Sequence, residues 1–185
     1  MGAGEKRRIL RSYDEMGGEL YDERYKSEQA SKYDMILRHS VLSADTLVLD
    51  DGCGTGLLLE RLQSYSVGID LSSSLLSMAL TRLSEKGQTF LIQANAEQLP
   101  FRNHIFEKVF SVTLIQNTPK PELTFVEIKR VARVGSEAVI TALKKSYTSQ
   151  GFRHLITASG FTLKYYIEDG ELKDWIAFTT IKKHH

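Results

Sequence analysis

The stretch Leu47–Glu60, L-V-L-D-D-G-C-G-T-G-L-L-L-E, decides the fold of this chain. Its first three residues are apolar and form the kind of short run that occupies a buried parallel strand. Two aspartates end this run, and glycines then fall at alternate positions before apolar residues return at helical spacing. The pattern predicts a strand, a glycine turn and a short helix over residues 57–62, with a backbone that a ligand can approach closely.

The spacing of the three glycines, Gly52, Gly54 and Gly56, narrows the choice of ligand. A dinucleotide fingerprint has the form G-x-G-x-x-G and places a pyrophosphate on a helix N-terminus, but here the third glycine comes one residue early. Asp50 would repel a pyrophosphate and suits a cationic ligand such as an ammonium or a sulfonium. The G-K-[ST] of a phosphate-binding P-loop is absent from this turn. A tight turn in another kind of α/β protein is the alternative.

The segment V-L-D-D-G-C-G-T-G resembles motif I of the class I S-adenosylmethionine-dependent methyltransferases. The resemblance implies a three-layer Rossmann-like α/β sandwich, with a seven-stranded, mostly parallel sheet whose last strand is antiparallel. It also implies that the methionine end of S-adenosylmethionine is held by Asp50 and the glycine turn, namely Gly52, Cys53, Gly54 and Gly56. We interpret Cys53 as a small packing residue and not as a nucleophile.

Asp70 ends the strand expected over residues 64–70 and follows the first glycine at roughly the 20-residue distance typical of a ribose-binding acid. A carboxylate accepts the hydroxyl hydrogen bonds more strongly than a neutral group does. The alternative role for Asp70 is the N-cap of the next helix. The segment G-I-D-L-S resembles the second motif of the family, which adds Leu71 to the expected cofactor site.

The segment N-A-E-Q-L-P-F begins at Asn95, where many family members have D-A-E-x-L-P-F and the acid binds the adenine amine. An amide oxygen at Asn95 still accepts this hydrogen bond, but without charge assistance. Asn95 and Ala96 are therefore expected at the adenine. Val112 ends the strand expected over residues 106–112 and precedes the segment that, in the family, runs past the transferred methyl group.

In that segment, T-L-I-Q-N-T-P-K, Gln116 and Asn117 occupy positions where relatives acting on quinones and other small molecules often have histidines. They are either substrate-binding residues or ordinary loop amides. The [DNS]-P-P-[YFW] arrangement is absent, and no cysteine is available for covalent attack on a pyrimidine. These absences argue against methyl transfer to adenine N6, glutamine or cytosine C5.

Residues 12–40 carry tyrosines among charged residues at roughly helical spacing and predict an N-terminal helical cap within residues 1–44, ahead of a core over 45–183. Methyltransferases that resemble this chain often carry a Y-D pair here, which implies that a tyrosine closes over the bound methionine part. Tyr21 and Tyr25 are the preferred contacts. Packing of half-buried tyrosines on the sheet edge is the alternative. The final His184 and His185 match the start of a purification tag.

Composition sets the outer bounds of these expectations. The 185 residues suit one domain, and 42% hydrophobic with 25% charged residues are typical of globular proteins. A net charge of +1 gives no overall positive charge that would favour binding to nucleic acid or to a membrane surface. One cysteine excludes an internal disulfide and a multi-cysteine metal site, and we expect no metal. No apolar run approaches the ~20 residues of a membrane span, and no signal peptide is visible, so the cytoplasm is the expected location.

The rest of the chain completes the expected fold. Hydrophobic periodicity and glycine stops predict helices over 75–83, 121–134 and 149–160, and strands over 89–94, 137–143, 161–167 and 174–181.

The predicted function is transfer of a methyl group to a small molecule bound between the 12–40 segment and the loop after Val112. One alternative is an RNA methyltransferase, acting on tRNA, with a basic face built from Arg7, Arg8, Lys129, Arg130, Arg133, Lys144, Lys145 and Arg153. Another is a non-catalytic subunit that binds the cofactor beside a partner protein. The sequence leaves both a homodimer and a heterodimer open.

Overall fold

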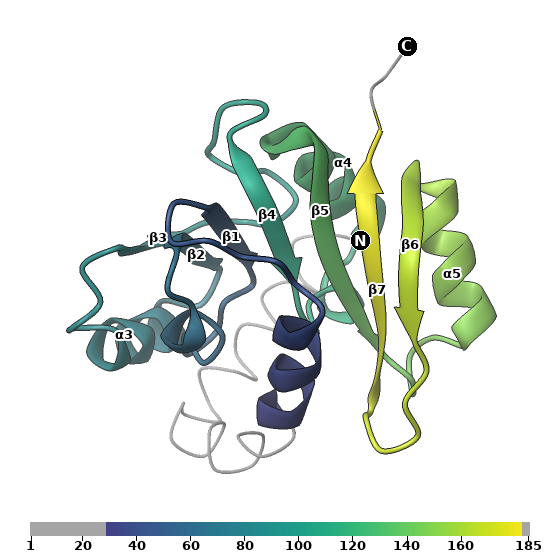
Figure 1. Ribbon diagram of the computed structural model, residues 1–185, viewed down its shortest axis with the longest axis horizontal. Helices are drawn as coiled ribbons and strands as arrows, with labels where there is room; N and C mark the ends of the chain where they lie inside the picture. The colour runs from purple at the N-terminus through teal and green to yellow at the C-terminus, as the bar shows by residue number, and fades with distance from the viewer. Residues whose placement is uncertain (1–28, 183–185) are drawn as a thin grey trace.

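The computed structural model describes residues 29–182, which form a seven-stranded sheet with helices on both faces (Figure 1). The strand order is β3-β2-β1-β4-β5-β7-β6, and β7 is antiparallel to both of its neighbours, while the other adjacent pairs are parallel. This arrangement confirms the predicted Rossmann-like fold. The strand order reverses beside β1, which is where open α/β sheets place their ligands.

The described elements follow the predicted order closely. The strands are β1 (Leu47–Asp51), β2 (Tyr65–Asp70), β3 (Thr89–Gln93), β4 (Phe106–Ser111), β5 (Ala132–Leu143), β6 (Phe161–Ile167) and β7 (Asp174–Ile181). The helices are residues 29–38, α3 (Ser73–Arg82), α4 (Pro121–Val131) and α5 (Ser149–Ala158), with single 3-10 turns at η1 (Leu59–Arg61) and η2 (Ile115–Asn117). None of these helices has the length and apolarity needed to cross a bilayer.

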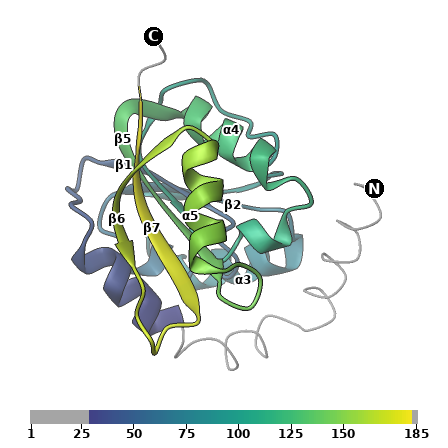
Figure 2. The ribbon, with the colours of Figure 1, turned by 90° about the vertical axis from the view of Figure 1, so that its right-hand side faces the viewer.

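The sheet separates two hydrophobic cores. Successive residues of a strand point to opposite faces, so Val48 belongs to the core under α3 and the 29–38 helix, whereas Leu49 belongs to the core under α4 and α5. Figure 2 shows the 29–38 helix on one side of the sheet and α4 and α5 on the other. Both cores meet the carboxyl end of β1, so the glycine turn is anchored from both faces.

The segment after the glycine turn differs from the predicted helix over 57–62. It forms turns and then only the 3-10 turn η1 before β2 begins at Tyr65. Leu58 and Leu59 are almost wholly buried here, so packing and not helical hydrogen bonding holds the segment.

The predicted helix over 121–134 is too long by one turn. α4 ends at Val131, and Ala132 already pairs with Phe106 as the first residue of β5. Gly135, which we expected to end the helix, lies inside β5 with a φ of 81°, near a register shift between β4 and β5. Strand pairing thus overrides the helical pattern at this junction.

The N-terminal helical cap is described from residue 29 onward. Gln29, Lys32, Tyr33 and Ile36 are buried at the i, i+3, i+4, i+7 positions of one helical face. The earlier part of the predicted cap, with Tyr21 and Tyr25, lies outside the described residues.

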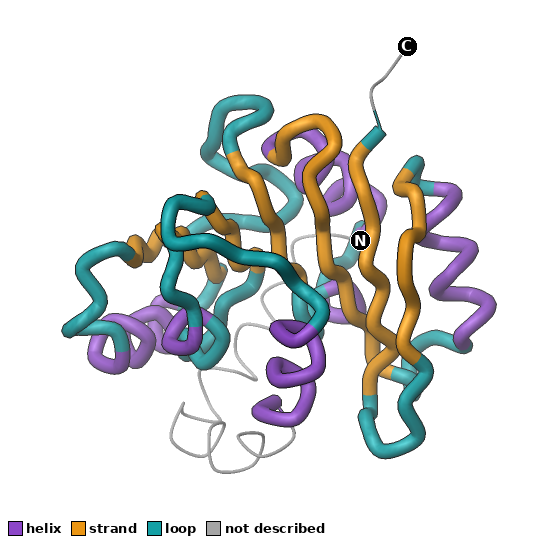
Figure 3. Tube along the Cα trace, in the orientation of Figure 1, coloured by secondary structure: helices purple, strands orange, loops and turns teal. Residues whose placement is uncertain are grey.

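At the other end of the sheet, the connection over residues 94–105 contains no helix (Figure 3), which leaves part of the sheet near β3 uncovered.

Candidate functional site

A cleft lies at the carboxyl ends of β1, β2 and β4, on the side that the 29–38 helix covers. Its empty volume, including solvent at the mouth, is about 1010 Å³. Predicted site residues that line it are Gly52, Cys53, Gly54, Asp70, Leu71, Asn95, Ala96, Val112 and Asn117. The chain thus brings residues from four separate segments to one place, as expected for a ligand at this edge of an α/β sheet.

Three predicted residues do not line the cleft. Asp50 is 2% exposed at the end of β1, directly before the turn. Gly56 packs beneath the turn, where an added Cβ would lie 3.2 Å from the Cβ of Ala79. Gln116 donates from Nε2 to the carbonyl of Thr113 and accepts from the amide of Leu143 at 3.4 Å.

The glycine turn exposes backbone to the cleft. Gly52 has a φ of 85°, and the amides of Gly52 and Cys53 both donate to the carbonyl of Ile69, at 2.9 and 2.8 Å. Gly54 has a φ of 53°, and a Cβ built on it would meet no protein atom within 4 Å. The open space beside Gly54 allows a ligand to lie in direct contact with the main chain.

Two acids, the buried Asp50 and the partly exposed Asp70, make this end of the cleft suitable for a cation. Asp70 accepts hydrogen bonds from the amides of Gly54 and Ser72, both at 2.9 Å. Burial raises the pKa of Asp70, although these amide hydrogen bonds oppose the rise. Burial, and then the charge of Asp70, raise the pKa of Asp50 to about 8. A cationic group placed beside both acids would relieve their repulsion and favour their charged forms.

Cys53 is buried, and its Sγ donates to the carbonyl of Gly54 at 3.8 Å. Burial and the neighbouring acids Asp50 and Asp70 raise the pKa of its thiol well above the usual value. A thiol that stays protonated fits a packing residue. Within residues 29–182, no three His, Cys, Asp or Glu side chains are grouped so that they could hold a metal ion.

Asn95 lies in a tight turn after β3 and lines the cleft beside the end of β2. Its Oδ1 accepts from the amide of Glu97 at 3.1 Å, and its own backbone pairs with Gln98. An amide oxygen has two lone pairs, so one remains for a ligand donor. Asn95 therefore retains the acceptor that the sequence comparison assigned to the adenine amine.

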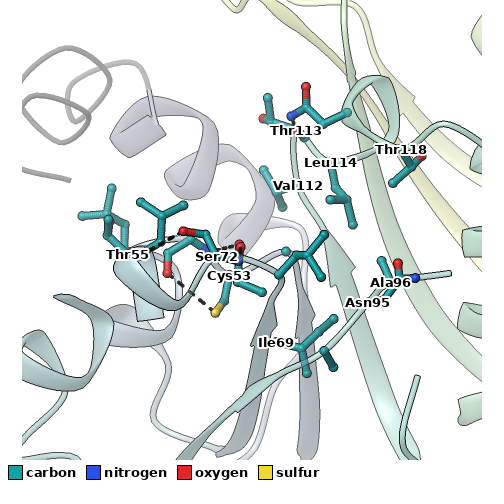
Figure 4. A pocket seen from close by; sticks show the side chains of 18 of the residues that line it. Cys53, Thr55, Ile69, Ser72, Asn95, Ala96, Val112, Thr113, Leu114 and Thr118 are labelled. Atoms are coloured by element: carbon teal, nitrogen blue, oxygen red, sulfur yellow. Dashed lines mark hydrogen bonds between the residues drawn. The ribbon is translucent and has the colours of Figure 1, made fainter. Parts of the chain in front are cut away.

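The remaining wall comes from the two segments between which the sequence analysis placed the acceptor, but its individual residues were not predicted. Gln29 and Tyr33 of the N-terminal helix line it, together with Thr113, Leu114, Thr118 and Pro119 from the loop after β4. Figure 4 shows Cys53, Thr55 and Ser72 approaching the cleft from one side and Val112, Thr113 and Leu114 from another. Helical periodicity includes Tyr33, but nothing in the local sequence distinguishes it from the earlier tyrosines, and no local pattern points to Thr113.

Comparison with known proteins gives a family from the sequence and the same fold from solved structures. A family model described as a methyltransferase domain matches residues 49–140. A malonyl-[acyl-carrier protein] O-methyltransferase of Marinomonas sp. is 32% identical, over 85% of this chain and 58% of the relative. A methyltransferase in complex with the Haloferax volcanii Trm112 methyltransferase activator has a TM-score of 0.79 at 13% identity, over 89% of this chain and 94% of that one. Phosphoethanolamine N-methyltransferase 2 of Haemonchus contortus was solved with S-adenosyl-L-methionine. It has a TM-score of 0.64 at 22% identity, over 71% of this chain and 37% of that one.

The chain belongs to the class I S-adenosylmethionine-dependent methyltransferase family. S-adenosylmethionine is the cofactor of this fold, and the open backbone at Gly54 and the two acids Asp50 and Asp70 fit a ligand of its charge. The chain spans about half the length of the curated relatives that it matches.

Proposed function

We propose that this protein transfers a methyl group from S-adenosylmethionine to a small-molecule acceptor. The observation that carries the proposal is the continuity of the cleft, which runs from the glycine turn to a wall formed by the 29–38 helix and the loop after β4. A cofactor on the first side and an acceptor on the second would lie in one cavity. The protein would then contribute chiefly by positioning the two reactants.

The cofactor-binding residues are assigned as follows. The backbone from Gly52 to Gly54 holds the methionine part, with Asp50 acting through its charge from behind the turn and Gly56 supporting the turn from beneath. Asp70 accepts from the ribose hydroxyls. Asn95 and Ala96 lie at the adenine, while Val112 packs beside the reactive end. When bound, S-adenosylmethionine supplies an electrophilic methyl group on a sulfonium. The carboxyl of Asp50 holds a proton in the empty cleft below pH 8, and an ammonium beside it would drive that proton off.

A small-molecule acceptor is favoured over RNA by the surroundings of the basic residues. Arg130 pairs with Glu127, Arg133 with Glu107, and Arg153 with Glu168, so these guanidinium groups are partly neutralised. The relatives include malonyl-[acyl-carrier protein], phosphoethanolamine and ubiquinone methyltransferases. Arg7 and Arg8 lie outside the described residues and enter the RNA alternative only through the sequence.

The proposal is tested by calorimetric titration with S-adenosylmethionine and S-adenosylhomocysteine, followed by methyl-transfer assays on small molecules and on tRNA. Asp50→Ala and Asp70→Ala should each weaken cofactor binding by roughly 1–3 kcal/mol, the scale of a lost hydrogen bond to a charged group. Asp45→Ala removes an exposed carboxylate and should leave binding unchanged. Wild-type affinity in both site variants would contradict the assignment, and transfer to tRNA alone would replace the small-molecule acceptor.

A partner protein is the second element of the proposal. β3 is the outermost strand on its side of the sheet, and its five residues include no charge and no proline. Phe90 is 61% exposed and Ile92 36% exposed, and they share a sheet face with Tyr65 of β2. Natural edge strands normally carry charges or prolines that block pairing, so this apolar edge favours a bound partner.

The structural relative in complex with the Trm112 activator shows that a chain of this fold can bind a partner protein. Co-expression of this chain with the activator from the same cell is therefore expected to give a co-purifying complex. Phe90→Lys should abolish the complex without changing the melting temperature, because the side chain is exposed. Lys164→Glu, on the opposite edge strand, is the matched control. Full activity of the isolated chain would contradict a requirement for the partner.

A further inference from the structure

A fully buried ion pair joins the N-terminal helix to the last strand. Nζ of Lys32 lies 2.8 Å from Oδ1 of Asp174, and both side chains are 0% exposed. Among the described residues, Oδ1 of Asp174 makes no hydrogen bond beyond this contact. Burying two charges is costly, and an apolar pair of similar volume usually stabilises a fold at least as well. The pair therefore calls for an explanation other than general stability.

The same two side chains converge on Thr113, the second residue after β4. Lys32 donates to Oγ1 of Thr113 at 2.7 Å, and that hydroxyl donates to Oδ2 of Asp174 at 3.0 Å. Oγ1 of Thr141 donates to the same carboxylate oxygen at 2.9 Å and accepts from the amide of Thr113 at 2.8 Å. The result is a closed polar network that links the N-terminal helix, β5, β7 and the loop after β4.

Thr113 has an unusual backbone. Its φ is 58°, in the left-handed region that a β-branched residue rarely adopts. Such a conformation persists only where surrounding contacts enforce it, and it is most often found at functional sites. Here the contacts are the hydrogen bonds from its own amide and hydroxyl.

The backbone of Thr113 in turn orders the cleft wall. Its carbonyl accepts from Nε2 of Gln116 and from Nδ2 of Asn117, the latter at 3.1 Å. Thr113, Leu114 and Asn117 all line the cleft. The helix that carries Lys32 also brings Gln29 and Tyr33 to the same wall, one turn and one residue away.

We propose that Lys32 and Asp174 are positioning residues that hold Thr113 in its left-handed conformation and so set the wall of the cleft where the acceptor binds. This inference rests on the proposed function, because it assigns the wall to the acceptor. The network makes its hydrogen bonds to β5, β7 and the 29–38 helix and none to the glycine turn; the loop meets that turn only through the side chain of Leu114, beside Gly52. Its loss should therefore disturb the acceptor side and spare the cofactor side.

Two changes remove the network while keeping the core filled. The double variant Lys32→Met/Asp174→Leu replaces the ion pair with apolar side chains together, so that neither charge is left buried alone. Thr113→Val keeps the shape of the side chain and removes its hydroxyl. Thr113→Ser keeps the hydroxyl and is the matched control. Melting temperatures establish that each variant is folded.

Amide hydrogen exchange of the full chain, followed by mass spectrometry, is the first readout. The double variant and Thr113→Val should exchange at least tenfold faster over residues 112–120, with residues 50–56 unchanged, and Thr113→Ser should match the wild type. Titration with S-adenosylhomocysteine should give dissociation constants within about threefold of wild type. Equally faster exchange over residues 112–120 and over residues 50–56 would mean general destabilisation. Unchanged exchange over both ranges would mean that the network does not hold the loop. Either result overturns the proposal.

Steady-state kinetics with an acceptor that the wild type methylates is the second readout. The two network variants should raise the KM for the acceptor or lower kcat at unchanged KM for S-adenosylmethionine, and Thr113→Ser should restore wild-type values. A selective rise in the KM for the cofactor would overturn the proposal. Failure of the wild type to methylate any acceptor would refute the proposed function, whereas the exchange result would still show whether the network positions the wall.

Discussion

The two halves of the sheet build their parts of the cleft in different ways. On the β3-β2-β1 side, the wall consists of a short glycine turn, of Asp70 at the end of β2, and of Asn95 two residues after β3. On the β4-β5-β7 side, Thr113 is held by Lys32 and Asp174, which are 81 and 61 residues away in the chain. One wall is made from local backbone geometry, and the other from contacts between distant segments.

This difference has a physical consequence for substitutions. A wall made from local backbone tolerates changes elsewhere in the fold but depends on the absence of side chains at its glycines. A wall held by a buried polar network fails when one distant member is lost, because the remaining groups are left buried without partners. Substitutions at and around the glycine turn can therefore show whether its wall depends on local backbone alone.

The largest expected effect is at Gly68, in the middle of β2. An added Cβ would lie 2.5 Å from Cδ1 of Leu59 and 2.9 Å from Sγ of Cys53. Gly68→Ala should therefore lower the free energy of unfolding by roughly 1–3 kcal/mol, as overpacking does, measured by urea denaturation. Gly87→Ala is the control, because nothing lies within 4 Å of its added Cβ. Equal unfolding free energies of the two variants would contradict the view that β2 packs tightly against the glycine turn and the leucines that follow it.

A contrasting stability effect is expected at Asp51. It is 0% exposed on the strand face that packs against α4, and among the described residues neither carboxylate oxygen has a hydrogen-bond partner. Asp51→Leu should raise the free energy of unfolding by roughly 1–3 kcal/mol, the cost of a buried unpaired polar group. An unchanged or lower unfolding free energy would show that the carboxyl is satisfied in solution.

The pH dependence of the same group gives an independent check. Burial, and then the charge of Asp50, raise the pKa of Asp51 well above its usual value. A raised carboxyl pKa stabilises the fold below the unfolded pKa of about 4 and loses that contribution as pH rises toward the folded pKa. The gap in stability between Asp51→Asn and the wild type should therefore widen from pH 5 to pH 8 in favour of the variant.

An effect of comparable size, up to about a hundredfold in all, is expected in cofactor affinity between pH 6 and pH 8. Asp50, with a pKa of about 8 in the empty cleft, is protonated at pH 6 and must release its proton when an ammonium binds beside it. The affinity for S-adenosylhomocysteine, which keeps the ammonium, should rise by up to about tenfold per pH unit from pH 6 toward pH 8. Calorimetry in two buffers of different ionisation enthalpy should detect the released proton. Asp50→Asn should flatten the profile, and a persistent slope would assign the proton to another group.

The smallest expected effect is at Asn95. Asn95→Asp should strengthen cofactor binding a few-fold, because a charged acceptor makes a stronger hydrogen bond to the adenine amine. The change is near-isosteric, and Oδ1 would still accept from the amide of Glu97. Parallel titrations with S-adenosylmethionine and with its inosine analogue, which lacks the amine, isolate this contact. A gain that persists with the analogue would place the contact elsewhere.

Sequence reasoning located most strands within one or two residues, because buried parallel strands are short apolar runs ended by glycines and acids. It failed where two elements compete for the same residues. At the junction of α4 and β5, the pairing of Ala132 with Phe106 overrode a helical pattern that continues to Val134. After Gly56, the chain packs Leu58 and Leu59 through turns and one 3-10 turn in place of the predicted helix.

What the sequence by itself determined is the glycine-turn side of the cleft in this methyltransferase fold. Strand, turn and acid are adjacent in the chain there, and glycine backbone angles are a local property. The tertiary structure alone decided the other wall. Nothing in the local sequence marks the left-handed backbone of Thr113 or the inward face of Gln29 and Tyr33. Both lie beside the buried ion pair between Lys32 and Asp174, whose members meet only when the 29–38 helix packs against the last strand.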